Sequence, residues 1–199
     1  MVAASNAVLS AHHLPTLPGE VIINAMVLPT APRMGSHAGI SDPARQLRLA
    51  EEFYARAHDL PDGLVHAYPG VEAVLLGART AGLVIGVVSN NQGALVRKLM
   101  RAVGLARYCQ LIWGEEDVPA PKPDPRGIDA ARRALGVAVE DCVYVGDGVT
   151  DVHGAHRAGM AVIGVTWGIH ARGEMQAMGF DRLVDTPQEL ADELHLDDA

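Results

Sequence analysis

Short apolar runs alternate with stretches of helical periodicity from about residue 66 onward, and this alternation constrains the fold more than any other feature. The run at 83–89 (LVIGVVS) is rich in β-branched residues, as expected for a strand covered on both faces. Further strands are predicted at 110–113, 142–145, 161–166 and 182–184, and helices at 92–103, 126–135, 151–158 and 187–196. Strands joined by single helices imply right-handed crossovers, so we predict an α/β fold with a doubly wound parallel sheet.

The first 65 residues show a different pattern. Helices are predicted over 3–12 and 43–58, and breaks rich in proline and glycine lie around them (LPTLPGE, LPTAPRMG and LPDG). The segment 20–28 (EVIINAMVL) fits a helix or a strand, because its periodicity does not decide between the two. We therefore expect a small helical domain over 1–65 and an α/β core over 66–199.

The charge balance argues against two classes of partner. Sixteen basic and 24 acidic residues give a formal net charge of −8, and no block of Lys and Arg stands out. We therefore expect no nucleic-acid partner and no binding to an anionic membrane. The longest apolar runs are too short to cross a bilayer, and the N-terminus lacks the basic region of a signal peptide. Cys109 and Cys142 show no CxxC spacing, which is typical of buried, reduced thiols in a cytoplasmic protein.

Polar residues follow three of the predicted strands or precede the next helix. Ser89 and Asn90 end the strand at 83–89, Lys122 lies in a proline-rich loop, and Asp147 ends the strand at 142–145, with Asp151 one helical turn later. In parallel α/β sheets, ligands gather at the carboxyl ends of the strands. A hydroxyl, an ammonium group and two carboxylates at that place predict a site for a phosphate group together with a divalent cation such as Mg²⁺.

Taken together, these residues are more specific evidence for a phosphate site than any one of them alone. A loop lysine is more often solvated than functional, and two nearby carboxylates repel each other unless a cation is present. Occurring in this order across successive strand–helix units, the residues indicate one phosphate site. His153 and His156 also lie one helical turn apart, but a zinc site needs more nitrogen or sulfur ligands than this stretch offers, so we expect them to be surface residues.

Three of these segments resemble motifs of the haloacid dehalogenase superfamily, in particular its phosphoglycolate phosphatase-like branch with a helical cap. They are VVSNN (87–91), PAPKPDP (119–125) and VYVGDGVTD (143–151). The resemblance implies that Ser89 and Asn90 bind phosphate and that Lys122 neutralises its charge. It implies a Mg²⁺ site at Asp147 and Asp151, with Asp147 as a direct ligand and Asp151 as the supporting carboxylate. It also implies catalytic roles for Lys122, Asp147 and Asp151, and it identifies the helical region over 1–65 with the cap.

One family motif has no counterpart in the sequence. The first motif of the superfamily is an Asp-x-Asp on the first strand, where one Asp is the nucleophile and the other the general acid/base. This chain contains no Asp-x-Asp, its first aspartate is Asp42, and its opening MVAASNAVLSAHHLP resembles the helix that follows the motif. The resemblance therefore implies that the chain begins later than the complete enzymes do, and that it is catalytically impaired.

The missing motif has a structural consequence. In the family the first strand is central, between the strands that carry the second and fourth motifs. Its absence would leave two inner strands with unpaired edges, unless residues 20–28 fill the place or the two strands close on each other. The sequence does not choose between these outcomes.

We therefore expect a Mg²⁺-dependent phosphatase of a small phosphorylated metabolite, such as phosphoglycolate, a sugar phosphate or a nucleotide, that uses an aspartyl-phosphate intermediate in its complete form. A mutase shares the same core and is less favoured. The alternative is a non-catalytic module that binds phosphate or another protein on a degraded phosphatase core. The oligomeric state is not predicted.

Overall fold

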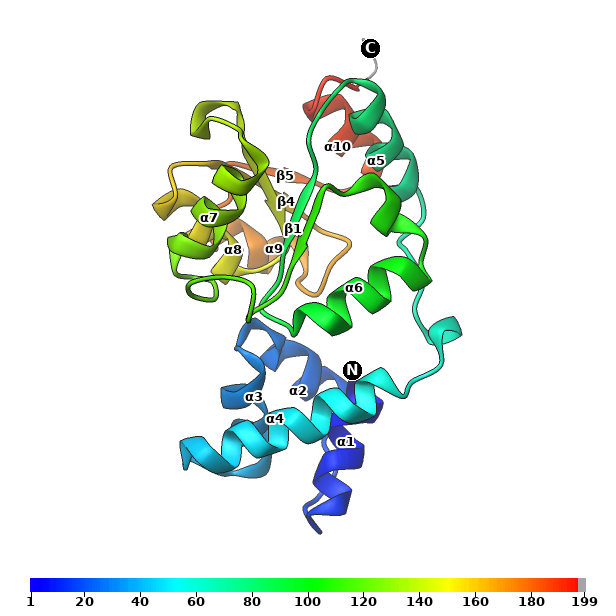
Figure 1. The fold of residues 1–199 in the computed structure, drawn as a ribbon, viewed down its shortest axis with the longest axis vertical. Coiled ribbons are helices and arrows are strands. Elements are labelled where there is room, and N and C mark those ends of the chain that lie inside the picture. Colours follow the sequence, from blue (N-terminus) through cyan, green and yellow to red (C-terminus); the bar gives the residue numbers. More distant parts are fainter. Residues whose placement is uncertain (197–199) are drawn as a thin grey trace.

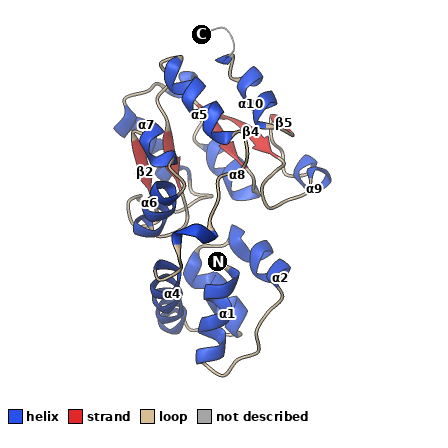
Figure 2. Cartoon of the chain, turned by 90° about the vertical axis from the view of Figure 1, so that its right-hand side faces the viewer, coloured by secondary structure: helices blue, strands red, loops and turns tan. Residues whose placement is uncertain are grey.

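The computed structural model describes residues 1–196 and shows a helical part beside an α/β part (Figure 1). The helical part contains α1 (Val2–Ala11), α2 (Gly19–Asn24), α3 (Thr30–Ala38) and α4 (Pro43–His58), with a 3₁₀ turn at Ala25–Val27. A second view shows the same division, with α1, α2 and α4 together at one end of the molecule (Figure 2). Residues 19–27 are thus helical, which settles in favour of a helix the choice that the periodicity left open for 20–28.

Helix α3 is not among the predicted helices, because its sequence TAPRMGSHA contains residues that usually break helices. Pro32 lies in the first turn of α3, where a proline removes no intrahelical hydrogen bond. Gly35 lies against Gln46 of α4, so closely that any side chain at position 35 would collide with it. The glycine therefore allows close packing of α3 on α4.

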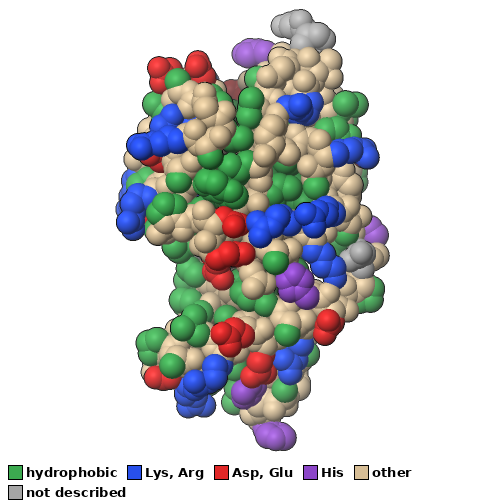
Figure 3. Space-filling model, viewed as in Figure 1, with side chains coloured by type: hydrophobic (Ala, Val, Ile, Leu, Met, Phe, Trp, Pro, Cys, Tyr) green, Lys and Arg blue, Asp and Glu red, His purple; other side chains and the backbone are tan. Residues whose placement is uncertain are grey.

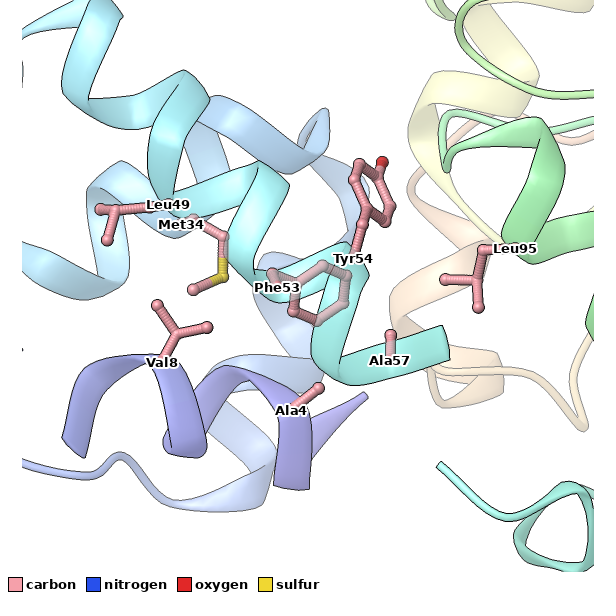
Figure 4. Close-up of a cluster of buried hydrophobic side chains, with 8 residues drawn as sticks. All are labelled: Ala4, Val8, Met34, Leu49, Phe53, Tyr54, Ala57 and Leu95. Carbon is pink, nitrogen blue, oxygen red and sulfur yellow. The ribbon is translucent and has the colours of Figure 1, made fainter. Parts of the chain in front are cut away.

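A buried cluster holds the helical part together. Val8, Met34 and Phe53 are all 0 % exposed, and their side chains meet between α1, α3 and α4 (Figure 4). Leu95 of α6 (Gly93–Ala102) joins the cluster from the α/β part. The hydroxyl of Tyr54 adds a polar link across the same boundary, since it accepts from the backbone N–H of Gln92 and donates to Glu115.

The strands are parallel, as predicted, but they form two separate sheets. The first pairs β1 (Gly86–Val88) with β2 (Leu111–Trp113), and the second has the order β3 (Val143–Gly146), β4 (Ala161–Val165), β5 (Arg182–Val184). The predicted strand at 83–89 is therefore shortened to three residues. This is a correction, and its physical reason is that a strand extends only as far as a partner pairs with it, and β2 is equally short.

Helices cover both faces of the strands. Helices α5 (Val71–Thr80) and α10 (Pro187–Glu193) pack against β4 and β5 on one face, around Ile163 and Val184. On the other face α7 (Pro125–Leu135) and α8 (Val149–Arg157) pack around Val162. Helix α9 (Arg172–Gln176) follows β4, and short 3₁₀ turns lie at Asp62–Leu64, Leu105–Tyr108 and Val139–Asp141. Helices α5 and α9 are not among those that the sequence pattern predicts.

A groove of about 420 Å³ separates the two sheets. Residues 86–88 of β1 and residues 143–146 of β3 line it, and neither of the outcomes that would close it occurs: residues 20–28 form a helix elsewhere, and β1 and β3 do not pair with each other. Val143 and Val145 of β3, which is the edge strand of its sheet, are 41 % and 39 % exposed. Figure 3 shows hydrophobic side chains reaching the surface in the middle of the α/β part.

Two further expectations can be compared with the structure. Both cysteines are free, but they are only partly buried, so the expectation of fully buried thiols is wrong. Among the described residues, no helix combines the length and apolar character needed to pass through a bilayer.

Candidate active site

The predicted site residues lie around a single hollow at the carboxyl ends of β1 and β3. Ser89 and Asn90 follow β1, Asp147 follows β3, Asp151 lies in the first turn of α8, and Lys122 comes from the loop before α7. All five line a space of about 200 Å³. The ends of parallel strands thus bring together residues that are up to 62 positions apart in the sequence (89 to 151).

Lys122 is held at the centre of a buried hydrogen-bond network. Its ammonium Nζ donates to Asp151 Oδ1 at 2.7 Å, to the Tyr144 hydroxyl at 2.8 Å and to the backbone carbonyl of Val88 at 2.9 Å. Only 11 % of the Lys122 side chain and 10 % of the Asp151 side chain are exposed. Burial alone would lower the pKa of Lys122, but Tyr144 and the Asp151 carboxylate more than compensate and raise it above its ordinary value. The lysine therefore carries a fixed positive charge.

Asn90 fixes the backbone of the lysine loop. Its side-chain amide donates to the carbonyl of Lys122, and its Oδ1 accepts from the N–H of Lys122, both at 2.8 Å. This pair of bonds uses the side chain in positioning Lys122. Any contact of Asn90 with phosphate, as predicted, would therefore be made by its backbone rather than by its side chain.

Asp151 has both carboxylate oxygens occupied by the protein. Oδ1 accepts from Lys122, and Oδ2 accepts from the backbone N–H groups of Asp147 and Gly148 at 3.2 and 3.1 Å. The position is suited to a carboxylate because it is the first turn of α8, where helix N–H groups favour negative charge. Asp151 thus organises the loop that carries Asp147.

Asp147 and Ser89 leave polar atoms directed at the hollow. Asp147 Oδ2 accepts from the N–H of Ile169 at 3.0 Å, and Gly168 lies so close to the carboxylate that a larger residue would collide with it. Ser89 Oγ accepts from the N–H of Asn91 at 3.1 Å, which leaves the hydroxyl proton able to donate. The N–H of Ser89 is used in pairing with Trp113.

A Mg²⁺ ion fits the donor set if most of its ligands are not protein groups. Among residues 1–196, no group of three or more His, Cys, Asp and Glu side chains is arranged to hold a metal ion. Mg²⁺ is commonly bound through one or two carboxylates, with waters and phosphate oxygens as the remaining ligands. Asp147 offers such a carboxylate, with one hydrogen bond from the Ile169 N–H to its Oδ2, whereas Asp151 is engaged by Lys122 and by two backbone N–H groups. His156, which the sequence also suggested as a possible metal ligand, pairs with Asp181 at the surface.

Six lining residues were not predicted as members of the site: Met26, Asn91, Gly148, Thr150, Ile169 and His170. His170 Nε2 and Asn91 Oδ1 are buried and have no hydrogen-bond partner in the described part of the chain. Buried polar atoms without partners are uncommon and often face a ligand or water. His170 could have been found from the sequence, because it follows the strand at 161–166 as Asp147 follows its own strand. Met26 could not, since nothing local indicates that the 3₁₀ turn reaches the site.

Comparison with known proteins agrees with this geometry. Residues 1–165 match the model of the family described as haloacid dehalogenase-like hydrolase. A phosphoglycolate phosphatase of Xanthomonas campestris pv. campestris is 31 % identical over 198 residues, which cover 96 % of this chain and 86 % of that protein. An N-acetylmuramic acid 6-phosphate phosphatase of Pseudomonas aeruginosa is 27 % identical, with 97 % of this chain and 86 % of that protein covered.

A solved structure extends the agreement to the fold. A haloacid dehalogenase-like hydrolase from Bacteroides fragilis superposes with a TM-score of 0.87 at 25 % identity, covering 95 % of this chain and 90 % of that one. These matches confirm the fold class and the family that the three motifs predict. The chain belongs to the haloacid dehalogenase-like hydrolase family.

Proposed function

We propose that the hollow binds the phosphate group of a small phosphorylated metabolite, and that it is the binding half of a Mg²⁺-dependent phosphatase site. The observation that carries the proposal is the convergence of Ser89, Lys122 and Asp147 on one small space, from the ends of two strands and from the loop before α7. The phosphatase activities named for its relatives support the reaction class. Phosphoglycolate and a sugar phosphate are both suitable substrates by size and charge.

The protein groups would divide the work of binding. The Ser89 hydroxyl donates a hydrogen bond to a phosphate oxygen, and the Lys122 ammonium offsets the negative charge of the phosphoryl group. Asp147 would hold Mg²⁺, which when bound would neutralise further phosphate charge. Asp151 keeps Lys122 and the Asp147 backbone in place. His170 is positioned to donate to the substrate from the side of the hollow next to Asp147.

The chain as given is expected to be catalytically impaired. No Asp-x-Asp is present in its sequence, and the place between β1 and β3 is an open groove. Groups that bind and polarise a phosphate ester do not replace a nucleophile, whose loss typically costs several orders of magnitude in rate. The same observation favours the second candidate, a non-catalytic phosphate-binding module, over a fully active enzyme.

Binding and turnover must therefore be measured separately. We expect inorganic phosphate to bind in the presence of Mg²⁺, as followed by isothermal titration calorimetry, and Ser89→Ala and Asp147→Asn to weaken it. Ser10→Ala is the matched control, because Ser10 is exposed on α1, outside the set of residues that line the hollow. Equal phosphate affinity in all four proteins would contradict the proposed site. Hydrolysis of phosphoglycolate at a rate usual for an enzyme would contradict the proposed impairment.

A further inference from the structure

The loop that follows β1 is held by groups of the loop that follows β2. We call residues 89–93 the phosphate loop, because the proposed phosphate site begins there. The carbonyl of Asn91 accepts from the backbone N–H of Glu115 at 2.9 Å. The N–H of Gly93 donates to both carboxylate oxygens of Glu116, at 2.8 and 2.9 Å. The loop after β2 therefore supports the phosphate loop from one side.

The two loops approach each other so closely that no side chain fits between them. A Cβ atom at Gly114 would lie 2.1 Å from the nitrogen of Gly93 and 2.5 Å from the carbonyl oxygen of Asn91, well inside van der Waals contact. Closely packed groups of this kind transmit small displacements to each other. A shift in the loop after β2 is therefore expected to shift the phosphate loop as well.

The hydroxyl of Tyr54, on α4, holds the phosphate loop from the side of the helical part. It points away from the apolar side chains of the buried cluster (Figure 4). It lies 2.9 Å from the backbone nitrogen of Gln92, 2.9 Å from Oε1 of Glu115 and 2.6 Å from Oγ1 of Thr30. Because Tyr54 is only 6 % exposed, water competes little for these hydrogen bonds.

The chemistry of these partners fixes the direction of each hydrogen bond. A backbone N–H only donates and an ionised carboxylate only accepts, whereas a hydroxyl has one proton and two lone pairs. Tyr54 therefore gives its proton to Glu115 and accepts from Gln92. Thr30 must then donate to Tyr54, and the Thr30 oxygen accepts in turn from Nη2 of Arg33 at 3.4 Å.

This chain of hydrogen bonds begins at a buried cation and ends at a carboxylate. Arg33 is 2 % exposed, and its Nε has no hydrogen-bond partner among the described residues. Burial lowers the pKa of Arg33, and Tyr54 and Glu115 act in the opposite direction. Hydrogen bonds that involve a charged group are stronger than neutral ones. We call the chain the relay, and its members in order are Arg33, Thr30, Tyr54 and Glu115.

We infer that Tyr54 is a positioning residue for phosphate binding, because the relay ties the helical part to the phosphate loop. The inference rests on the proposed function, since it takes residues 89–93 to bind phosphate. It adds that phosphate affinity depends on hydroxyls of α3 and α4, none of which lines the hollow. Phosphate should accordingly strengthen the attachment of the helical part, because such coupling is reciprocal.

The first test removes the hydroxyl that contacts the phosphate loop. Tyr54→Phe should weaken the Mg²⁺-dependent binding of inorganic phosphate about three- to tenfold, as expected for the loss of one hydrogen bond that orders a loop. Leu49→Ala is the matched control, because Leu49 is 2 % exposed in the same buried cluster on α4 and lies outside the hollow. It should lower the melting temperature at least as much and leave phosphate affinity unchanged.

Isothermal titration calorimetry compares the variants at a temperature where all of them are folded. Amide hydrogen exchange locates the effect, and it should be faster at residues 92 and 93 in Tyr54→Phe than in Leu49→Ala. Phosphate affinity that falls equally in both variants would show a general effect of destabilisation and would overturn the inference.

A pair of variants at Thr30 tests the rest of the relay. Thr30 is 0 % exposed, and Thr30→Val keeps its size but removes the hydroxyl, whereas Thr30→Ser keeps the hydroxyl but removes a methyl group. We expect Thr30→Val to weaken phosphate binding about two- to fivefold and Thr30→Ser to retain it. Packing alone predicts the opposite order, since the lost methyl group leaves a cavity. Equal affinity in both variants, or a larger loss in Thr30→Ser, would overturn the relay.

The same titrations separate this inference from the proposed function. Absence of phosphate binding in the natural chain contradicts the proposed function, and the inference with it. Phosphate binding that is weakened by Ser89→Ala and unchanged by Tyr54→Phe supports the proposed function and overturns the inference alone. Binding that is weakened by both, and by Thr30→Val, supports the two together.

Discussion

The helical part and the α/β part bury their apolar residues to very different extents. In the helical part, Val8, Met34 and Phe53 are fully enclosed. In the α/β part, Val143 and Val145 of β3, at the edge of its sheet, remain exposed along an open groove. A helix satisfies its own backbone and needs only a packed face, whereas a strand depends on a neighbour at each edge. An unpaired edge therefore exposes apolar residues of a sheet, whereas the helical part has no such edge.

The largest difference in stability between the two parts is expected when one apolar side chain in each is shortened to alanine. Phe53→Ala removes a fully buried ring and should lower the free energy of unfolding by about 3–5 kcal/mol. Val145→Ala removes two methyl groups that are already partly in water, and should cost about 1 kcal/mol or less. Urea denaturation measures both values. A Val145→Ala cost as large as that of Phe53→Ala would mean that the groove is closed in solution.

Removing the buried charge at the end of the groove should have an effect of similar size. Lys122→Met leaves the Asp151 carboxylate buried without its ion-pair partner, and we expect a loss of about 3–5 kcal/mol in the free energy of unfolding. Adding Asp151→Asn to this variant should recover part of the loss. Arg133→Met is the control, because the exposed pair of Arg133 with Asp129 should contribute about 0–1 kcal/mol. Additive losses from the two buried changes would argue against their coupling.

The boundary between the two parts depends on one hydroxyl. Tyr54→Phe removes hydrogen bonds to Thr30, Glu115 and the N–H of Gln92, and should lower the free energy of unfolding by about 1–3 kcal/mol. Tyr68→Phe is the control, since Tyr68 is more than half exposed. Thermal unfolding followed by circular dichroism compares the two. An unchanged melting temperature in Tyr54→Phe would show that packing alone holds the helical part in place.

The smallest expected effect is a pH dependence at the same boundary. Burial raises the pKa of Glu115 above its ordinary value; the hydrogen bond from Tyr54 opposes this shift, and nearby Glu116 adds to it. A raised pKa means that the folded state holds the proton more tightly, so this group's contribution is fully present below its ordinary pKa and is lost as the pH rises through the folded value.

A conservative variant isolates that contribution. Glu115→Gln cannot titrate, so the stability difference between the natural chain and this variant should shift in favour of the natural chain as the pH falls from neutral toward about 4.5. Glu51→Gln on the exposed side of α4 serves as the control. Parallel pH profiles for the natural chain and Glu115→Gln would show that Glu115 does not titrate differently in the folded state.

The sequence predicts the α/β part well where neighbours along the chain determine the structure. β5 is found where it is expected, and α7, α8 and β4 differ by one or two residues at their ends. The extent of β1 could not be predicted, because it depends on pairing with residues 111–113. Helix α3 was not predicted, because the close contact that requires Gly35 is made with Gln46 of another helix and cannot be read from the local sequence.

The candidate site shows the same limit. Strand ends place Ser89 and Asp147, the loop before α7 places Lys122, and these positions are readable from the sequence. Which carboxylate oxygens remain free is not readable, because Asp151 is occupied by a lysine 29 positions away and by backbone groups of its own loop. The hydrogen-bond partners of Asp151 therefore required the structure.

The hydrogen bond from Lys122 to the Val88 carbonyl links anion binding in the hollow to the exposure of the β1 edge, which would otherwise be independent. A single ammonium group supplies positive charge to the hollow and also donates a hydrogen bond to the Val88 carbonyl at the edge of β1. Whatever draws that ammonium toward the hollow also uncovers the edge, and thermodynamic reciprocity requires the converse. Anion affinity of the hollow and exposure of the Val88 carbonyl should accordingly rise and fall together.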